Sequence, residues 1–287
     1  MGSEMCIRDR PSNVTVGTEF GEVLDGADIV LGVMPSHHAR RMYSEMLPHL
    51  RPSMIVASAS KGLEEETQLR TSEVMREVLG REFERRIAVL SGPTFAREVA
   101  RGEPAAVVVA SPQAEVAKAL QSAFSGPTLR LYTNTDIIGV ELGAALKNVI
   151  AIGAGVCHGL GLGNNTMAAL ITRGLAEITR LAVAMGGQPS TLAGLAGLGD
   201  LVLTCTGDLS RNRTVGLKLA RGHRLEEILG STQMVAEGVR TTSAAVCLAR
   251  KWNVEMPIAV QMHEMLERGK SPRDAIRDLM ERSLKGE

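Results

Sequence analysis

The strongest constraint on the fold is a change of pattern in the chain near residue 135. From Asn13 to about Tyr132, short runs rich in β-branched residues alternate with segments of helical periodicity. From Thr135 onward the short runs stop, and helical patterns follow one another. Alternating strands and helices are typical of a parallel sheet covered by helices, whereas helices alone indicate a helical domain. We therefore expect an α/β domain followed by an all-α domain.

The elements of both domains can be predicted from hydrophobic periodicity. The expected strands are residues 28–34, 54–59, 87–90, 105–110 and 129–132. The expected helices are residues 37–50, 69–79, 112–124, 136–156, 167–185, 214–220, 225–229, 241–252, 258–267 and 272–280. Asn164 or Asn165 is expected to cap the second long helix of the all-α part. The predicted fold is thus a doubly wound, Rossmann-like sheet followed by a helical C-terminal domain.

Composition argues against several functional classes. The 287 residues include 32 basic and 32 acidic side chains and 2% aromatic residues, whereas a nucleic-acid-binding protein is usually clearly basic. The four cysteines form no C-x-x-C pair, which argues against a disulfide framework or zinc site and is typical of reduced thiols in the cytoplasm. No uninterrupted apolar run reaches the ~18 residues of a membrane span. We expect a cytoplasmic protein with no nucleic-acid, membrane or metal partner.

Two loops at expected strand ends carry candidate binding residues, because ligands of doubly wound sheets sit beyond the carboxyl ends of the strands. In Ser60–Lys61–Gly62 the lysine is placed to hold a phosphate or polarise a carbonyl; otherwise Lys61 is a solvated loop side chain. In the segment from Ser91 to Ala96, Gly92 allows close backbone approach and the following helix start offers N–H groups to an anion. The alternative there is a simple turn closed by Pro93.

A lysine inside the most apolar helical pattern is a candidate general base. Lys147 lies between Leu146 and Val149, so a buried helix would shield its ammonium group. Desolvation or a second cation, such as Lys61, lowers a lysine pKa from ~10.4 toward the range of a general base. The alternative is a lysine whose stem lies along a helix edge and whose amine reaches water.

The last candidate segment runs from Gly197 to Arg213. The glycine-rich backbone is expected to present Asp200 from a tight turn. The segment Ser210–Arg211–Asn212 is a candidate phosphate-binding site, since arginine binds phosphate through two hydrogen bonds. An exposed charged loop is the alternative.

Each of these motifs is weak alone, but their order along the chain is specific. The segments are Ser60–Glu64, Ser91–Ala96, Glu141–Asn148, Gly197–Leu201, Ser210–Asn212 and Val235–Gly238. From Asn13 to the C-terminus the chain resembles the bacterial-type NAD(P)-dependent glycerol-3-phosphate dehydrogenases.

This resemblance implies roles for individual residues. Lys147 would accept the C2 hydroxyl proton of sn-glycerol 3-phosphate as hydride passes to NAD or NADP, and would return it to dihydroxyacetone phosphate in reverse. Substrate would be bound by Lys61, Gly92, Thr94, Asp200, Ser210, Arg211 and Asn212. The cofactor would be bound by Lys61, Ala96, Arg211, Val235 and Glu237, with no metal. The resemblance also implies a homodimer and a role in glycerophospholipid synthesis.

The chain departs from the family at its start. The family begins with a strand, a G-x-G-x-x-G turn and a helix that seat the cofactor pyrophosphate, and no such run precedes Asp28. We interpret residues 1–11 as a non-native or disordered leader, 12–134 as a partial dinucleotide-binding domain, and 135–287 as the helical substrate and catalytic domain. Roughly 40–60 residues, one to two βα units, are expected to be missing, so the doubly wound sheet is expected to be incomplete. We expect this chain to bind cofactor poorly and to be unstable or prone to aggregation.

Two other functions stay open. A β-hydroxyacid dehydrogenase or a ketopantoate reductase also combines a nucleotide domain with a lysine from a helical domain, although Ser210–Arg211–Asn212 favours a phosphorylated substrate. A phosphate-binding module without catalysis would explain the absent fingerprint, but not the retained Lys61, Lys147 and Asp200.

Overall fold

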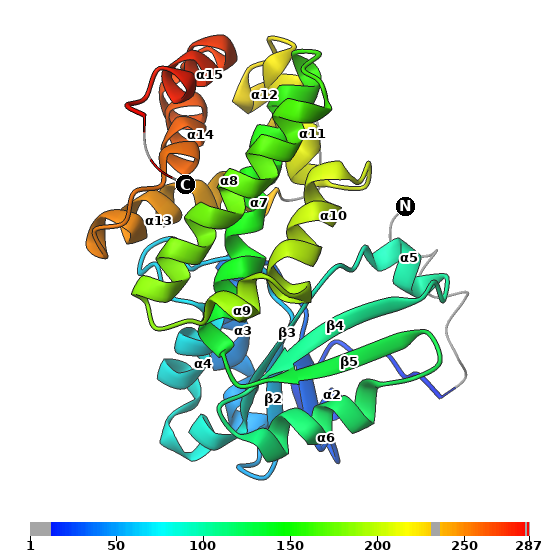
Figure 1. Ribbon diagram of the computed structural model, residues 1–287. Coiled ribbons are helices and arrows are strands. Elements are labelled where there is room, and N and C mark those ends of the chain that lie inside the picture. The colour runs from blue at the N-terminus through cyan, green and yellow to red at the C-terminus, as the bar shows by residue number, and fades with distance from the viewer. Residues whose placement is uncertain (1–12, 231–235, 285, 287) are drawn as a thin grey trace.

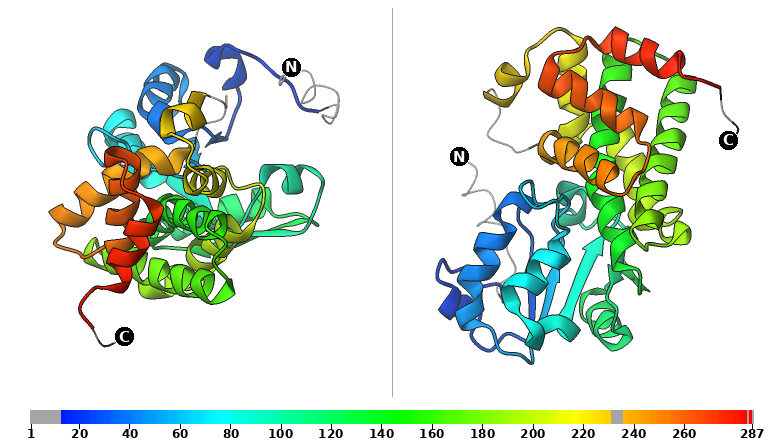
Figure 2. Two further views of the ribbon diagram at one scale, coloured as in Figure 1. Left: turned by 90° about the horizontal axis from the view of Figure 1, so that it is seen from above. Right: turned by 90° about the vertical axis from the view of Figure 1, so that its left-hand side faces the viewer.

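The computed structural model describes residues 13–230, 236–284 and 286. The first half of the chain forms a sheet with covering helices, and the second half forms a helical body beside the end of that sheet (Figure 1). The two halves are joined by α7 (Ile137–Gly159), which starts at the sheet and runs through the helical body (Figures 1 and 2). The expected α/β part followed by an all-α part is therefore confirmed.

Within the described residues, five strands form one sheet in the order β1-β2-β3-β4-β5. They are β1 (Ile29–Gly32), β2 (Ile55–Ser58), β3 (Ile87–Ser91), β4 (Ala105–Ala110) and β5 (Leu129–Asn134). Each strand falls on an apolar run that the sequence predicts. β1, β2 and β3 are parallel, so their carboxyl ends meet at one edge of the sheet.

The direction of β4 differs from a purely parallel doubly wound sheet. β4 runs antiparallel to β3, with Leu90 opposite Val109, and parallel to β5. The connection between β3 and β4 contains only the five-residue helix α5 (Ala96–Ala100). A helix this short does not cross the sheet as the connection between parallel strands must, so the chain returns in the opposite direction.

Helices cover both faces of the sheet. They are α2 (Phe20–Val23), α3 (Ala39–Met46), α4 (Thr71–Leu79) and α6 (Ala114–Phe124), with 3₁₀ turns at Ser36–His38, Leu47–His49 and Arg81–Arg86. Val56 packs toward Tyr43 and Met75 on one face. Its neighbours Ile55 and Ala57 pack toward α6 on the other. This alternation is why a strand buried on both faces reads as a continuous apolar run.

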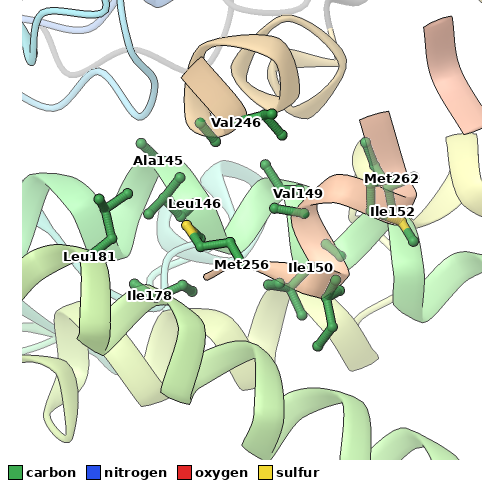
Figure 3. Close-up of a cluster of buried hydrophobic side chains, with 14 of the residues drawn as sticks. Ala145, Leu146, Val149, Ile150, Ile152, Ile178, Leu181, Val246, Met256 and Met262 are labelled. Atoms are coloured by element: carbon green, nitrogen blue, oxygen red, sulfur yellow. The ribbon is translucent and has the colours of Figure 1, made fainter. Parts of the chain in front are cut away.

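The helical body packs around α7. Its other helices are α8 (Asn164–Ala184), α9 (Pro189–Leu192), α10 (Asp200–Thr206), α11 (Arg211–Ala220), α12 (Leu225–Gly230), α13 (Glu237–Lys251), α14 (Pro257–Arg268) and α15 (Pro272–Met280). Figure 3 shows Leu146 and Ile150 of α7 among Ile178 of α8, Val246 of α13 and Met262 of α14. A helix that is apolar on all sides belongs in such a core.

By length and composition, α7 is the one helix of the described residues that could cross a membrane, with a mean hydropathy of 1.6. Its sequence is not an uninterrupted apolar run, because it contains Glu141 and Lys147. Of its most apolar stretch, 94% is buried inside the protein, as in the central helix of a packed core.

Glycines let α11 approach α7 at backbone distance. A Cβ on Gly155 would collide with the carbonyl oxygen of Arg213, and a Cβ on Gly216 would collide with that of Ile152. The two helices therefore pack main chain against main chain, and the start of α11 has little freedom to move relative to α7.

Two local expectations are wrong. The sequence predicts one helix over residues 37–50, but α3 is flanked by 3₁₀ turns, and Pro48 lies in the second of them. Pro48 has no N–H for an α-helical hydrogen bond. Asn164 and Asn165 lie inside the first turn of α8, and Gly163 occupies the capping position without a side-chain bond.

Among the described residues, β1 lies at one edge of the sheet. It pairs with β2 on one side, and the apolar side chains of Leu31 and Val33 are 37% and 71% exposed. An exposed apolar edge is a template for pairing with another chain. The expectation that this chain aggregates stays a prediction.

Candidate active site

The carboxyl ends of β2 and β3 meet α7 and α10 around a cluster of three charged side chains. Lys61 follows β2, Lys147 lies on α7, and Asp200 is the first residue of α10. Asp200 Oδ2 accepts a hydrogen bond from Lys61 Nζ at 2.9 Å, and Asp200 Oδ1 forms an ion pair with Lys147 Nζ. Two lysines thus share one carboxylate, and the cluster carries a net positive charge whenever both amines are protonated.

The cluster is almost closed to water. Asp200 is 1% exposed and Lys147 is 5% exposed, so the expected shielding of this lysine is confirmed. The alternative in which its amine reaches water is therefore wrong. Lys61 is more open, with 20% of its side chain exposed, and it is the member that an incoming ligand can reach.

Close contacts at two glycines fix the position of Asp200 at the start of α10. A π-helical turn, Leu195–Gly199, leads directly into α10. A Cβ on Gly197 would collide with the carbonyl oxygen of Leu192, and a Cβ on Gly143 of α7 would lie 2.7 Å from that of Ala196. The expected tight turn at Asp200 is therefore wrong, because these glycines serve contact between segments and the backbone stays helical.

The surroundings of Lys147 lower its pKa to about 7. Burial is the largest cause, because it penalises the ammonium form, and the nearby Lys61 cation is the second. The Asp200 carboxylate acts in the opposite direction. Both effects predicted from the sequence, desolvation and a second cation, act on this amine, so it can be neutral or charged near pH 7.

Asp200 is held by two hydroxyl groups for which the sequence predicts no role. Ser91 Oγ donates to Asp200 Oδ2 at 3.4 Å, and Thr204 Oγ1 donates to the Asp200 carbonyl at 2.6 Å. Ser91 ends β3 within a segment noted in the sequence, and Thr204 lies one helical turn after Asp200. Position at a strand end and the i, i+4 spacing were the available signals for these two residues.

The loop after β3 needs Gly92. Its φ is 151°, and a Cβ there would lie 2.9 Å from Val107 Cα. The Gly92 carbonyl accepts a hydrogen bond from Lys61 Nζ at 2.9 Å, and Thr94 Oγ1 lies 3.4 Å from the same nitrogen. Ala96 is exposed at the start of the short α5. The structure thus brings Gly92 and Thr94 to Lys61 and leaves Ala96 at the surface.

Ser210, Arg211 and Asn212 take three different positions at the start of α11. Ser210 is 3% exposed, and its hydroxyl caps the helix by accepting from Arg213 N at 3.3 Å. Asn212 is 8% exposed and hydrogen-bonded to Asn148. Arg211 is exposed, and among the described residues no carboxylate pairs with it. Its guanidinium is therefore the group of this segment best placed to receive a phosphate.

Glu237 starts α13 and accepts a hydrogen bond from Ser36 N, in the loop after β1, at 3.2 Å. Burial raises the pKa of its carboxyl group, and Arg211 opposes that shift. Glu237 thus connects the strand-end loops to α13. Val235 lies outside the described residues.

The strand-end loops after β1 and β2 meet α13 near Glu237. A Cβ on Gly62 would collide with Ser36 Oγ, so the loop after β2 needs a glycine where it packs against the Ser36 side chain. The hydroxyl of Thr241 is buried there without a hydrogen-bond partner among the described residues. A polar ligand would satisfy this hydroxyl. Within those residues, no strand-to-helix turn carries a G-x-G-x-x-G run.

Two family models match this chain. Residues 7–117 match the N-terminus, and residues 136–277 the C-terminus, of NAD-dependent glycerol-3-phosphate dehydrogenase.

Individual relatives agree with these matches. The chain is 59% identical over 273 residues to a glycerol-3-phosphate dehydrogenase [NAD(P)+] of Koribacter versatilis. The match covers 95% of this chain and 81% of the relative. The crystal structure of glycerol-3-phosphate dehydrogenase from Coxiella burnetii is 39% identical, with a TM-score of 0.89, and covers 95% of this chain and 82% of that one.

A ketopantoate reductase from Ralstonia eutropha is more distant. It is 15% identical with a TM-score of 0.55, and the likeness covers 92% of this chain and 81% of that one. At this identity the likeness shows the fold alone.

Proposed function

The chain belongs to the NAD-dependent glycerol-3-phosphate dehydrogenase family, and on this premise we propose that it interconverts sn-glycerol 3-phosphate and dihydroxyacetone phosphate with NAD or NADP. The observation that carries the proposal is the buried cluster of Lys147, Asp200 and Lys61 at the carboxyl edge of the sheet. It combines a lysine of pKa about 7 with a second lysine that can bind a phosphorylated substrate.

In the oxidation direction, neutral Lys147 Nζ accepts the proton of the C2 hydroxyl group. In the reduction direction, the ammonium form returns that proton to the ketone oxygen. Asp200 stabilises the ammonium that forms, and Lys61 with Arg211 attracts the phosphate. When bound, the nicotinamide cofactor supplies or accepts the hydride. Lys61, Ala96, Arg211 and Glu237 are the described residues that would hold it, and the unpartnered hydroxyl of Thr241 would offer it a further hydrogen bond.

The two directions should depend on pH in opposite ways. Oxidation needs the neutral amine of Lys147, so its rate should rise as pH increases through about 7. Reduction needs the ammonium form, so its rate should fall above the same pH. Rates measured in both directions from pH 5.5 to 9 check this. Two profiles that rise together would contradict a single lysine as both acceptor and donor of the proton.

The direct test of the proposed activity compares three ketones. Oxidation of NADH or NADPH is followed with dihydroxyacetone phosphate, with unphosphorylated dihydroxyacetone, and with ketopantoate. We expect turnover with the first alone, since Lys61 and Arg211 recognise phosphate. Turnover with ketopantoate would instead favour the related reductases. Binding of glycerol 3-phosphate without turnover, measured calorimetrically, would favour a non-catalytic phosphate-binding protein.

Several wider features rest on the resemblance or on composition and stay proposals. They are a homodimer, a cytoplasmic location, supply of a glycerophospholipid precursor, and catalysis without a metal ion.

A further inference from the structure

A row of buried hydrogen bonds runs beside the lysine cluster. The N–H of Gly238 donates to Asn212 Oδ1 at 2.9 Å, and Asn212 Nδ2 donates to Asn148 Oδ1 at 2.9 Å. Asn148 Nδ2 then donates to the carbonyl oxygen of Lys61 at 3.1 Å. We call these three bonds the amide relay.

The two ends of the amide relay fix the orientation of both asparagine amides. At one end stands a backbone N–H, which only donates, and at the other a backbone carbonyl, which only accepts. Asn212 must therefore turn its oxygen to Gly238, and Asn148 must turn its nitrogen to Lys61. A flipped amide would place two donors or two acceptors against each other.

Every member of the amide relay is, or directly follows, a proposed site residue. Lys61 is itself in the site, Asn148 follows Lys147, Asn212 follows Arg211, and Gly238 follows Glu237. The relay thus joins the loop after β2 to α7, α11 and α13, which are far apart in sequence.

The surroundings leave the amide relay little freedom. A Cβ on Gly238 would lie 2.6 Å from the Asn148 carbonyl oxygen and 2.8 Å from Asn212 Oδ1. Asn148 and Asn212 are 5% and 8% exposed, so water does not readily replace a lost bond, and the remaining partner stays unsatisfied. The glycine contact between α7 and α11 prevents the two helices from closing a gap between these side chains.

We propose that Asn148 and Asn212 are positioning residues whose amide relay holds the backbone of Lys61 in register with α7 and thereby fixes the separation of the Lys61 and Lys147 amines. Its catalytic meaning rests on the proposed function. Asn212, which the resemblance assigns to substrate binding, also acts through Lys61: its oxygen and one amide hydrogen are engaged within the protein, and its second amide hydrogen stays available to a ligand.

The ionisation of Lys147 reports on this separation. Lys147 interacts electrostatically with the Lys61 ammonium, the Asp200 carboxylate, the Cys205 thiol and the Glu237 carboxyl group. Burial raises the pKa of Cys205 to about 12, so this thiol is neutral near pH 7. If Lys61 withdraws, Lys147 loses the cation that lowers its pKa while Asp200 remains.

The test is an NMR titration of the whole chain labelled with ¹³Cε-lysine. The Lys147 signal is assigned by its absence from Lys147→Met. In Asn148→Ala and in Asn212→Ala we expect its midpoint to rise by about 1 pH unit. The double variant should move it no further than either single change, because the three bonds act in series. Asn148→Ser serves the same purpose if the alanine variant does not fold.

The control variant is Asn134→Ala. Asn134 Nδ2 donates to Thr191 Oγ1 at 3.3 Å, and Asn134 Oδ1 accepts from Asp136 N at 2.8 Å, next to the start of α7 and away from Lys61. This change should lower stability and leave the Lys147 midpoint in place. Folded relay variants with an unchanged midpoint would overturn the proposal. The titration needs no substrate, so a shifted midpoint in a chain that does not turn over dihydroxyacetone phosphate would uphold the amide relay and reject the proposed function.

Discussion

Replacing Lys147 with alanine is expected to lower kcat/KM for dihydroxyacetone phosphate by about 10²–10⁴-fold, the usual contribution of a general acid or base. The amine is 5% exposed and is paired with Asp200. No water molecule of ordinary pKa can replace a donor whose pKa is about 7. The loss should fall mainly on kcat, because Lys61 and Arg211 still bind the phosphate. Steady-state rates at saturating cofactor measure it.

Two matched variants separate chemistry from packing. Lys147→Met keeps an unbranched apolar side chain without the amine, and it should be as inactive as the alanine variant. Lys118→Ala removes an exposed lysine of α6 and should keep full activity. Added methylamine should restore part of the activity of Lys147→Ala, because the space left by the side chain can admit a small amine. It should not restore activity to Lys147→Met, whose side chain fills that space. An active Lys147→Met would show that this amine does not carry the proton.

The elements that the sequence predicted best are those whose signals are local. Helix α15 was expected at residues 272–280 and is found there. Pro272 occupies its first position, and Ser271 Oγ accepts a hydrogen bond from Asp274 N at 3.1 Å. Such capping bonds lie within one helical turn. Their residue types are therefore visible in the sequence before any tertiary contact is known.

The direction of β4 and the helical setting of Asp200 depend on contacts between distant segments. The apolar run at 105–110 has the same composition for either strand direction. Gly197 reads as a turn residue, and only its contact with Leu192 shows that it serves close packing. Short-range patterns contain neither fact.

The candidate site divides in the same way. Lys61, Lys147 and Asp200 could be named because strand ends, a lysine in an apolar helix and a resemblance each pointed to them. Asn148 received no role, since its partner Lys61 is 87 residues away in sequence. An asparagine beside a lysine has no distinctive spacing, and its partner appears only once the chain is folded.

Replacing Glu141 with alanine is expected to lower the free energy of unfolding by about 3–5 kcal/mol, the typical cost of removing one member of a buried ion pair. Glu141 lies on α7, and its carboxylate accepts from Arg70 Nη1 at 2.7 Å, from Ser72 N at 2.7 Å and from Ser72 Oγ at 2.6 Å. Arg70 is 4% exposed. Without Glu141 its guanidinium would keep, among the described residues, only Glu73, whose side chain is 30% exposed, as an ion-pair partner, and Ser72 N at the start of α4 would lose its acceptor.

The contrast with two other variants makes this expectation specific. Glu45→Ala removes an exposed i, i+4 partner of Arg41 and should cost less than about 1 kcal/mol. Arg70→Met together with Glu141→Ala removes both buried charges, and it should be more stable than Glu141→Ala alone, because the charge that loses its partner, Glu73, has a side chain that is 30% exposed. Urea unfolding followed by circular dichroism measures all four chains. If the double variant were less stable than Glu141→Ala, the loss of stability would come from lost packing between α4 and α7. It would not come from an arginine that has lost its buried partner.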